Sequence, residues 1–295
     1  MIGLFFGILN NIRHRLFGYV RPRAISGSQI DENIKYDHLV ISTLESRLQS
    51  YFSIDNPFAE KRILEVGPGQ DLGTGIILLT KNATSYMAID RFSLAQKNDA
   101  FYTTLGKNIE KISEVKRPEH IQKTLQLCLQ DPQNKYLPYF QYYVAPAEDL
   151  SIIPELKEET RDLIFSQSVL HTIDDIDTFF QSAFRVLSEG GIMCHEIDLR
   201  TMMSGFRHRD PFVILRYNTN VYNALLHYPG APNRLRSDDF IESARKAGFR
   251  NVSFEAITTA EKKDDKLVPI RLDAQFSSKN PDVLAQLTGV LYAQK

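Results

Sequence analysis

Glycine, acidic and hydroxyl-bearing residues lie at the ends of four short apolar segments of this sequence. They are Glu65-Val66-Gly67-Pro68-Gly69, Asp90, Ala147-Glu148-Asp149 and Ser166-Gln167-Ser168-Val169-Leu170-His171. Glycines let the backbone turn sharply and let a ligand approach without a Cβ in the way. A carboxylate such as Asp90 can accept hydrogen bonds from both hydroxyls of a ribose, although it could instead cap the next helix. These residue types favour a ligand that contains a nucleoside.

Side chains that could accept a proton lie near the same segments. His171 follows the fourth segment, and His195, Glu196 and Asp198 end the fifth. An unperturbed imidazole titrates close to neutral pH, so His171 and His195 are the candidate general bases. Structural roles are the alternatives, with His171 capping a helix and His195 buried in a strand. Glu196 could equally serve as the charge partner of Arg200.

The elements that must position these residues are strands that alternate with helices. Apolar runs predict strands, and amphipathic periods predict helices over 31–53, 176–187 and 240–249. The strands are expected over 62–66, 85–89, 141–144, 162–166, 192–197, 252–257 and 288–293. The alternation predicts an α/β fold, a Rossmann-like, doubly wound, mostly parallel seven-stranded sheet with an antiparallel edge hairpin. We expect a helical extension over 1–58, a catalytic domain over 59–295 and an irregular lid insertion over about 199–236.

Composition limits the possible classes of protein. The chain has 295 residues, 35 Lys plus Arg and 36 Asp plus Glu, so its formal net charge is −1. A general nucleic-acid binder would need an excess of basic residues, so no nucleic-acid partner is expected. Cys128 and Cys194 lie far apart without zinc-ligand spacing, so neither a metal site nor a disulfide framework is predicted.

The first residues form an apolar and basic segment. Apolar residues recur at helical spacing, and four arginines follow without any acidic residue before Asp31. The apolar positions are Ile2, Phe5, Leu9, Ile12, Leu16 and Val20, and the arginines are Arg13, Arg15, Arg21 and Arg23. The run is too short to cross a bilayer and lacks the features of a signal peptide. Residues 1–23 could therefore lie on an anionic membrane, or cover the protein's own core or a dimer partner.

The glycine loop differs from the fingerprint of nicotinamide enzymes. That fingerprint is G-x-G-x-x-G, whereas here Gly73 follows Gly67 and Gly69 one residue late. Glu65, two residues before the first glycine, is not part of it either. These departures favour another nucleoside cofactor, and an NAD(P)-dependent oxidoreductase is kept as an alternative.

The complete set of blocks resembles a known family. ILEVGPGQDLGTG, YMAID, APAEDL, DLIFSQSVLHTIDD and RVLSEGGIMCHEIDLR resemble, in order and spacing, class I S-adenosylmethionine-dependent methyltransferases. The resemblance extends from about residue 60 to 200, and NRLRSDDFIESARKAGF adds to it. More narrowly, GPGxxLGTG, HxIDLR and the N-R-L-R…D-F block are similar to bacterial methyltransferases associated with polysaccharide or secondary-metabolite pathways.

The resemblance implies S-adenosylmethionine as the cofactor and assigns residues to its parts. Glu65, Gly67 and Gly69 would hold the methionine end, Asp90 the ribose, Arg91, Ala147 and Glu148 the adenine, and Gln167 and Ser168 would face the sulfonium. Many relatives have Asp where this chain has Pro146. Adenine recognition is therefore assigned to Glu148 or Asp149.

The expected acceptor is a small molecule or a glycan, methylated on oxygen by in-line transfer. Five arginines of the lid lie among tyrosines and could bind phosphate or carboxylate, or could form structural ion pairs. They are Arg207, Arg209, Arg216, Arg234 and Arg236, with Tyr217, Tyr222 and Tyr228. A noncatalytic cofactor-binding module that uses residues 1–23 is the other alternative. The expected location is the cytoplasm, at the inner face of the membrane, and the sequence leaves the oligomeric state open.

Overall fold

The computed structural model describes most of the chain. The described residues are 2–17, 29–112, 115–130, 137–202, 206–228, 230–263, 266–267 and 271–295. They form two compact units. The glycine-loop unit comprises residues 21–167, 182–194 and 294–295, and the lid unit comprises residues 1–20, 168–181 and 195–293.

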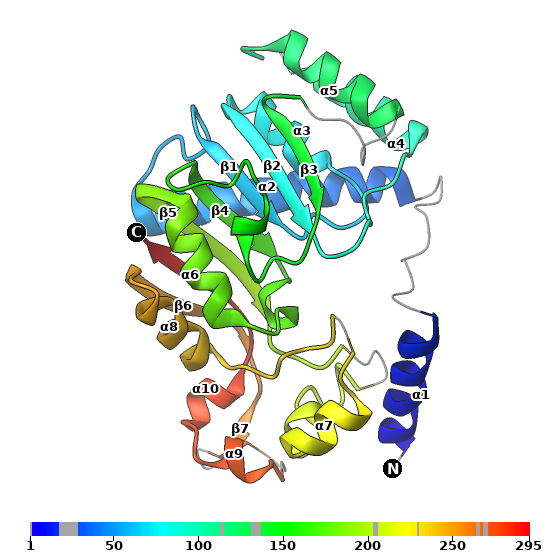
Figure 1. The fold of residues 1–295 in the computed structure, drawn as a ribbon, viewed down its shortest axis with the longest axis vertical. Helices are drawn as coiled ribbons and strands as arrows, with labels where there is room; N and C mark the ends of the chain where they lie inside the picture. Colours follow the sequence, from blue (N-terminus) through cyan, green and yellow to red (C-terminus); the bar gives the residue numbers. More distant parts are fainter. Residues whose placement is uncertain are drawn as a thin grey trace. The chain divides into compact units, whose positions relative to one another are not determined.

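A seven-stranded sheet has the strand order β3-β2-β1-β4-β5-β9-β6 (Figure 1). Its strands are β1 (Arg62–Val66), β2 (Ser85–Asp90), β3 (Phe140–Val144), β4 (Arg161–Gln167), β5 (Leu187–Asp198), β6 (Arg250–Thr259) and β9 (Gln286–Gln294). Strand β1 pairs in parallel with both β2 and β4, and β2 pairs in parallel with β3. The order reverses between β1 and β4, and ligands bind beside such a reversal, beyond the carboxyl ends of the strands. The predicted Rossmann-like fold is confirmed.

Strand β9 runs antiparallel to its neighbours. The amide of Leu199 donates to Leu287 O at 2.8 Å and that of Lys295 donates to Gly191 O at 3.0 Å, so the paired numbers run in opposite directions. The amide of Ala260 likewise donates to Ala285 O at 2.8 Å. The predicted antiparallel pair at the sheet edge is confirmed, with β9 inside and β6 at the edge.

Helices of the glycine-loop unit cover its buried strands. They are α2 (Ile30–Phe52), α3 (Gly73–Thr80), α4 (Asp99–Ile109) and α5 (Pro118–Gln130), and a 3₁₀ turn, η2, spans Leu150–Ile152. In Figure 1, α2 and α3 lie behind β1 and β2. Four of the five residues of β1 are buried, as expected for a strand that is covered on both faces. Within α2, Leu39 is 60% exposed, whereas other apolar residues of the helix are buried.

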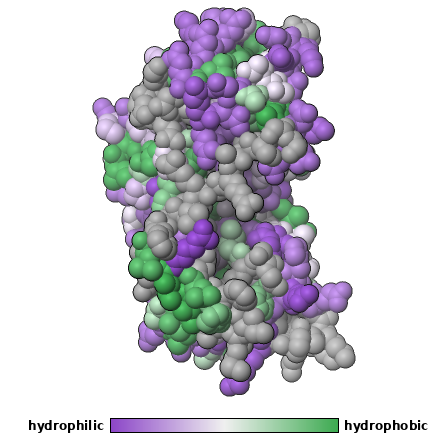
Figure 2. Space-filling view, turned by 90° about the vertical axis from the view of Figure 1, so that its right-hand side faces the viewer, coloured by the Kyte–Doolittle hydropathy of each residue, from purple (hydrophilic) through white to green (hydrophobic). Residues whose placement is uncertain are grey.

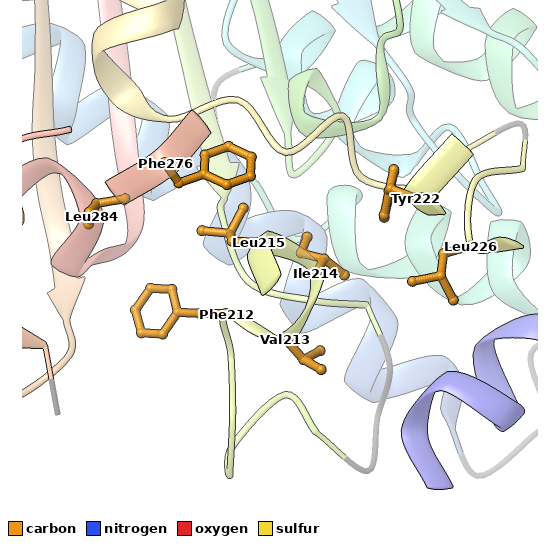
Figure 3. Close-up of a cluster of buried hydrophobic side chains, with 8 residues drawn as sticks. All are labelled: Phe212, Val213, Ile214, Leu215, Tyr222, Leu226, Phe276 and Leu284. Atoms are coloured by element: carbon orange, nitrogen blue, oxygen red, sulfur yellow. The ribbon is translucent and has the colours of Figure 1, made fainter. Parts of the chain in front are cut away.

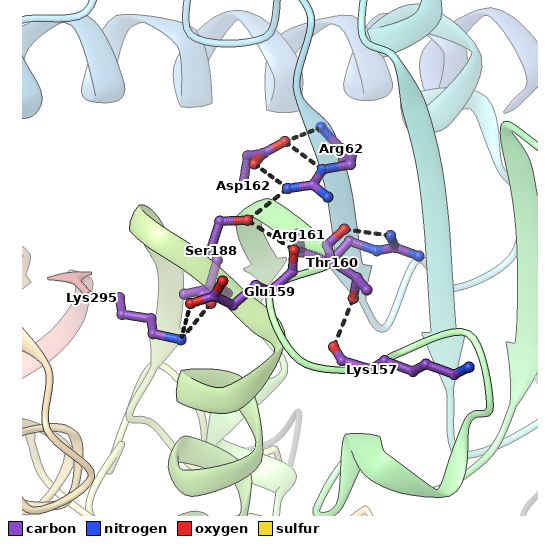
Figure 4. Close-up of polar contacts among 9 residues, drawn as sticks. Arg62, Lys157, Glu159, Thr160, Arg161, Asp162, Ser188 and Lys295 are labelled. Carbon is purple, nitrogen blue, oxygen red and sulfur yellow. Dashed lines mark hydrogen bonds and ion pairs between the residues drawn. The ribbon is translucent and has the colours of Figure 1, made fainter.

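Ion pairs join the starts of β1 and β4 (Figure 4). The guanidinium of Arg62 donates to Asp162 Oδ1 at 2.8 Å and Oδ2 at 3.0 Å, and to Ser188 Oγ at 2.6 Å. The amide of Arg62 also donates to Asp162 Oδ2 at 2.8 Å. These contacts hold the amino ends of two adjacent strands, so they set the register at the end of the sheet away from the glycine loop.

The lid unit has more regular structure than its sequence predicted. The segment 199–236 was expected to be irregular, yet it contains η4 (Val213–Arg216) and α7 (Thr219–Leu225). Buried side chains of this segment form a core with residues from the C-terminal part of the chain (Figure 3): Phe212, Val213, Ile214, Leu215, Tyr222, Leu226, Phe276 and Leu284. Distant residues thus supply the apolar contacts that order the insertion.

The remaining helices and strands include both long and short elements. They are α1 (Ile2–Phe17), η3 (Leu170–Thr172), α6 (Ile176–Val186), α8 (Ser237–Lys246), the β7–β8 pair (Lys262–Lys263 and Lys266–Leu267), α9 (Ala274–Ser277) and α10 (Pro281–Ala285). The predicted helix over 176–187 is confirmed as α6, but β5 begins at Leu187 rather than at Ile192. Among the described helices, none combines the length and the apolar character needed to cross a membrane. The predicted positions Val20, Arg21 and Arg23 lie outside the described residues.

Candidate active site

The glycine loop after β1 leaves open space at its centre. Gly67 and Gly69 have φ angles of +73° and +83°, a region that side-chain-bearing residues rarely adopt. The amide of Gly67 donates to Ile89 O at 2.8 Å, which ties the loop to β2. Apart from Gly69 and its two chain neighbours, no heavy atom lies within 4 Å of the position that a Cβ on Gly69 would take. The loop can therefore receive a ligand against its backbone.

The carboxylate of Asp90 lies next to this open loop. Its Oδ2 accepts from the amide of Gly69 at 3.4 Å, and its Oδ1 accepts from the amide of Phe92 at 3.1 Å. Burial raises the pKa of Asp90 to about 6, although the amide hydrogen bonds oppose this shift. An acid that ends β2 beside a glycine with free space fits the ribose of an adenosyl group, as the sequence predicts.

Glu65 is buried inside β1, directly before the loop. Its Oε2 accepts hydrogen bonds from Thr74 Oγ1 and from the Tyr86 hydroxyl, both at 2.6 Å. Burial nevertheless raises the pKa of Glu65 to about 7. A nearby cation would favour the charged form of this carboxyl, so the residue suits a cofactor with positive charge at its methionine end.

Two acidic residues near the loop were not singled out from the sequence. Asp37 of α2 and Asp71 of the loop interact with each other, and burial raises the pKa of both. Asp71 Oδ1 also accepts from the amide of Gly73 at 2.9 Å. Asp37 lies three residues after Ile34 and seven before Leu44, on the buried stripe of α2. A carboxylate at such a position in an amphipathic helix is the signal that could have identified it.

The residues assigned to adenine lie after β2 and β3. Arg91 and Glu148 form an ion pair, and Ala147 is buried. Asp149 instead caps η2, with Oδ1 accepting from the amide of Ser151 at 2.9 Å. The sequence assigns adenine recognition to Glu148 or Asp149. In the structure Asp149 has a structural contact, whereas Glu148 forms the ion pair with Arg91.

The end of β4 carries the residues assigned to the sulfonium side. Gln167 is the last residue of β4. Ser168, in the lid unit, has a φ of +56°, and its amide donates to Glu196 O at 2.8 Å. A left-handed residue that is not glycine costs on the order of 1 kcal/mol and often marks a functional turn.

His171 lies in η3 of the lid unit and is 3% exposed. Among the described residues, neither of its ring nitrogens has a hydrogen-bond partner. Burial lowers the pKa of His171 to about 4; the charge of Asp198 opposes this shift, and the charge of Arg207 adds to it. The imidazole is therefore neutral at physiological pH, and burial makes it a weaker base than a free imidazole.

His195 lies in β5 and is fully buried. Its ring meets that of Phe179 edge to face, with 5.9 Å between the ring centres. Burial lowers the pKa of His195 to about 3, so this ring is also neutral. These surroundings fit the structural alternative, in which His195 is a buried residue of a strand.

Asp198, at the end of β5, organises two arginines. Arg200 donates to Asp198 Oδ1 at 2.9 Å and Oδ2 at 2.8 Å, and Arg207 forms a second ion pair. Although burial opposes it, these contacts lower the pKa of Asp198 below its ordinary value. The partner of Arg200 is thus Asp198, not Glu196 as considered from the sequence.

Most of the lid arginines have partners inside the lid unit. Arg216 pairs with Asp210 at 2.9 Å, and Arg234 lies over the Tyr222 ring at 4.2 Å. Arg236 is fully buried and donates to the carbonyls of Leu199 and Leu284 at 2.9 and 3.0 Å. With Arg207 held by Asp198, four of the five arginines have structural partners, and two of these four, Arg207 and Arg216, form ion pairs. Arg209 is exposed.

Comparison with known proteins identifies a methyltransferase domain. Residues 102–195 match the family described as a methyltransferase domain. No curated protein matches the chain. Among the described residues, no cluster of three or more His, Cys, Asp or Glu side chains could hold a metal ion.

Several solved structures are similar to this one. An S-adenosylmethionine-dependent methyltransferase from Mesorhizobium loti is 12% identical, with a TM-score of 0.45 over 84% of this chain and 97% of that one. A putative one from Listeria monocytogenes is 12% identical, with a TM-score of 0.43 over the same shares. Phosphoethanolamine N-methyltransferase 2 of Haemonchus contortus, in complex with S-adenosyl-L-methionine, is 14% identical, with a TM-score of 0.43 over 84% of this chain and 52% of that one.

Three observations now agree. The strand order places β1 and β4 on either side of the reversal, the glycine loop and Asp90 fit an adenosyl group, and the family match covers the centre of the chain. The nicotinamide alternative has no such support. The chain is similar to S-adenosylmethionine-dependent methyltransferases, and its residues 102–195 match a methyltransferase domain.

Proposed function

We propose that the protein methylates a hydroxyl oxygen of a small-molecule or glycan acceptor. The observation that carries the cofactor half of this proposal is the buried Asp90 carboxylate beside the open backbone of Gly69. S-adenosylmethionine supplies a methyl group activated by a positively charged sulfonium. The protein must then bind the cofactor and the acceptor, align them and accept one proton. Alignment alone can lower the activation barrier by up to about 7–11 kcal/mol.

The cofactor-binding residues divide into three groups. Glu65, Gly67 and Gly69 would hold the methionine end, and Asp90 would accept from the ribose hydroxyls. The ion pair of Arg91 with Glu148, together with Ala147, would border the adenine. Gln167 and Ser168 would face the sulfonium.

The proton is the reason for proposing a hydroxyl acceptor. A hydroxyl must lose its proton near the transition state, and His171 and His195 are neutral imidazoles. His171 is the stronger candidate, because its ring nitrogens have no hydrogen-bond partner among the described residues and it lies near the charge of Asp198. A nitrogen or carbon acceptor would not need this base.

The second part of the proposal concerns where in the cell the protein works. We infer that the protein works at the inner face of a membrane and reaches it through residues 1–23. The absence of any acidic residue before Asp31 in the sequence supports this inference.

The test combines turnover with cofactor binding. Purified protein, methyl-labelled cofactor and a panel of hydroxylated metabolites and glycans should yield a labelled product. Asp90→Ala should weaken cofactor binding by roughly 1–3 kcal/mol, because charge-assisted hydrogen bonds to the ribose are lost. Unchanged affinity in calorimetry would remove Asp90 from the site. Binding without transfer to any acceptor would instead favour a noncatalytic cofactor-binding module.

A further inference from the structure

The helix α1 exposes a stripe of large apolar side chains. Phe5, Leu9, Ile12 and Leu16 are 60, 46, 47 and 70% exposed. At about 100° per residue, these four positions fall within an arc of about 60° on the helix. This stripe therefore does not cover the protein's own core, although such cover was one of the alternatives for residues 1–23.

The opposite face of α1 is the one that holds it to the lid unit. The His14 ring stacks on that of Tyr228, just beyond α7, with 4.3 Å between ring centres and 13° between planes. Asn11 is 3% exposed. Position 14 lies about 160–180° around the helix from Phe5 and Leu16. The stripe thus points away from the surface on which α1 rests. Figure 2 views the side of the molecule that carries α1, and its lower part shows a hydrophobic patch.

Charge indicates which partner this stripe fits. Arg13, Arg15, Arg21 and Arg23 are the charged residues before Asp31, so this segment carries four positive charges and no negative one. Arg13 is exposed, and helical spacing places it beside the stripe. An apolar stripe in a segment with arginines and no acidic residue matches an interface of acyl chains and anionic headgroups.

The length of α1 determines how it can meet a bilayer. Its 16 residues extend about 24 Å, and no described helix can cross a membrane. An amphipathic helix of this kind lies in the plane of the interface.

We propose that α1 docks the protein on an anionic lipid surface, with Phe5, Leu9, Ile12 and Leu16 inserted among the acyl chains. This inference rests on the membrane contact proposed above and names its lipid class and its contact face. Because α1 rests on Tyr228 through His14, docking holds the lid unit at the lipid surface.

Sedimentation with vesicles tests the proposal on the full-length protein. The protein should bind vesicles of phosphatidylcholine with about one third phosphatidylglycerol, and bind phosphatidylcholine alone at least about tenfold more weakly. The variant Leu9→Ser/Ile12→Ser/Leu16→Ser should lose at least about tenfold in binding to the anionic vesicles, because its stripe no longer enters the acyl region.

A matched variant controls for the loss of exposed apolar side chains in general. Leu39→Ser/Ile152→Ser/Ile257→Ser removes three such side chains from α2, η2 and β6, which are 60, 51 and 50% exposed, and should bind as the wild type does. Arg13→Gln/Arg15→Gln leaves the stripe intact and should lose about fivefold for each charge removed. Circular dichroism and adenosylhomocysteine binding report whether each variant is folded.

Several outcomes would overturn the proposal. They are absence of wild-type binding, equal binding to both vesicle types, or full binding by the stripe variant. A wild-type dimer that becomes a monomer in the stripe variant, measured by light scattering, would assign the stripe to a second copy. Methyl transfer is measured separately, so loss of vesicle binding with intact transfer refutes only the membrane proposal.

Discussion

Single residues of the candidate site carry unusual proton affinities. Burial raises the pKa of Glu65 to about 7 and that of Asp90 to about 6. In the cofactor-free protein both carboxyls are therefore partly protonated near neutral pH. Cofactor with a positive charge favours their ionised forms, so binding should release protons.

This linkage predicts that cofactor affinity rises with pH. Between pH 5.5 and 8 the affinity for S-adenosylmethionine should increase about ten- to a hundredfold. At higher pH fewer protons have to leave Glu65 and Asp90 when the cofactor binds. Calorimetry in two buffers of different ionisation enthalpy would measure both affinity and proton release. Adenosylhomocysteine lacks the sulfonium charge and should show a smaller dependence, and Glu65→Gln should remove most of it. A flat profile for the wild type would contradict the assignment.

At the scale of elements, α3 begins in a crowded place. A Cβ on Gly73 would lie 2.0 Å from Asp37 Oδ2 of α2 and 3.0 Å from Phe101 Cζ of α4. The glycine that comes too late for the nicotinamide fingerprint thus allows α2 to pack on the loop. Its position follows from helix packing.

A double-mutant cycle tests this packing. Gly73→Ala should destabilise the protein by about 1–3 kcal/mol, because the added methyl group has no room. Asp37→Ala should restore part of this loss in the double variant, since it removes the nearest atom. Gly106→Ala is the control, because its Cβ would meet only the flexible end of Leu125, at 3.2 Å. Chemical denaturation gives each free energy, and strictly additive effects would refute the contact.

At the scale of the whole molecule, the two units hold buried groups of opposite type. The glycine-loop unit contains Glu65, Asp90, Asp37 and Asp71, whose pKa values are raised. The stabilising contribution of Glu65 and Asp90 is present below the unfolded pKa values near 4 and is lost as pH rises through about 6–7. The lid unit contains His171 and His195, with pKa values lowered to about 4 and 3. Their contribution is present above about 6.5 and is lost as pH falls.

The two units should therefore loosen at opposite ends of the pH range. Hydrogen exchange, corrected for intrinsic rates, should show lower protection of α2, β1 and α3 at pH 8 than at pH 6. Protection of η3 and of the lid-unit part of β5 should be lower at pH 5 than at pH 7. The variant His195→Leu should reduce the acid effect in β5. Uniform loss of protection in both units would contradict this assignment.

The sequence by itself determined the strands, their order along the chain and the acid and glycine positions of the cofactor site. Strand β1 begins and ends as predicted, and Asp90 ends β2 as expected. This was possible because short buried strands have continuous apolar runs, and because the carboxyl ends of parallel strands meet at one edge. The division into residues 1–58 and 59–295 and the roles of the site residues stay predictions.

The tertiary structure alone decided which polar groups are buried and what they contact. From the sequence, Arg236 could bind an acceptor or form a structural ion pair, yet it donates to carbonyls 37 and 48 residues away. Asp37 meets Asp71 across two elements, and the stripe of α1 is exposed rather than covered. Such contacts depend on how distant elements pack, and local periodicity holds no information about the partner. Burial in turn sets the proton affinities of Glu65 and His171, because the cost of a buried charge depends on the surrounding protein.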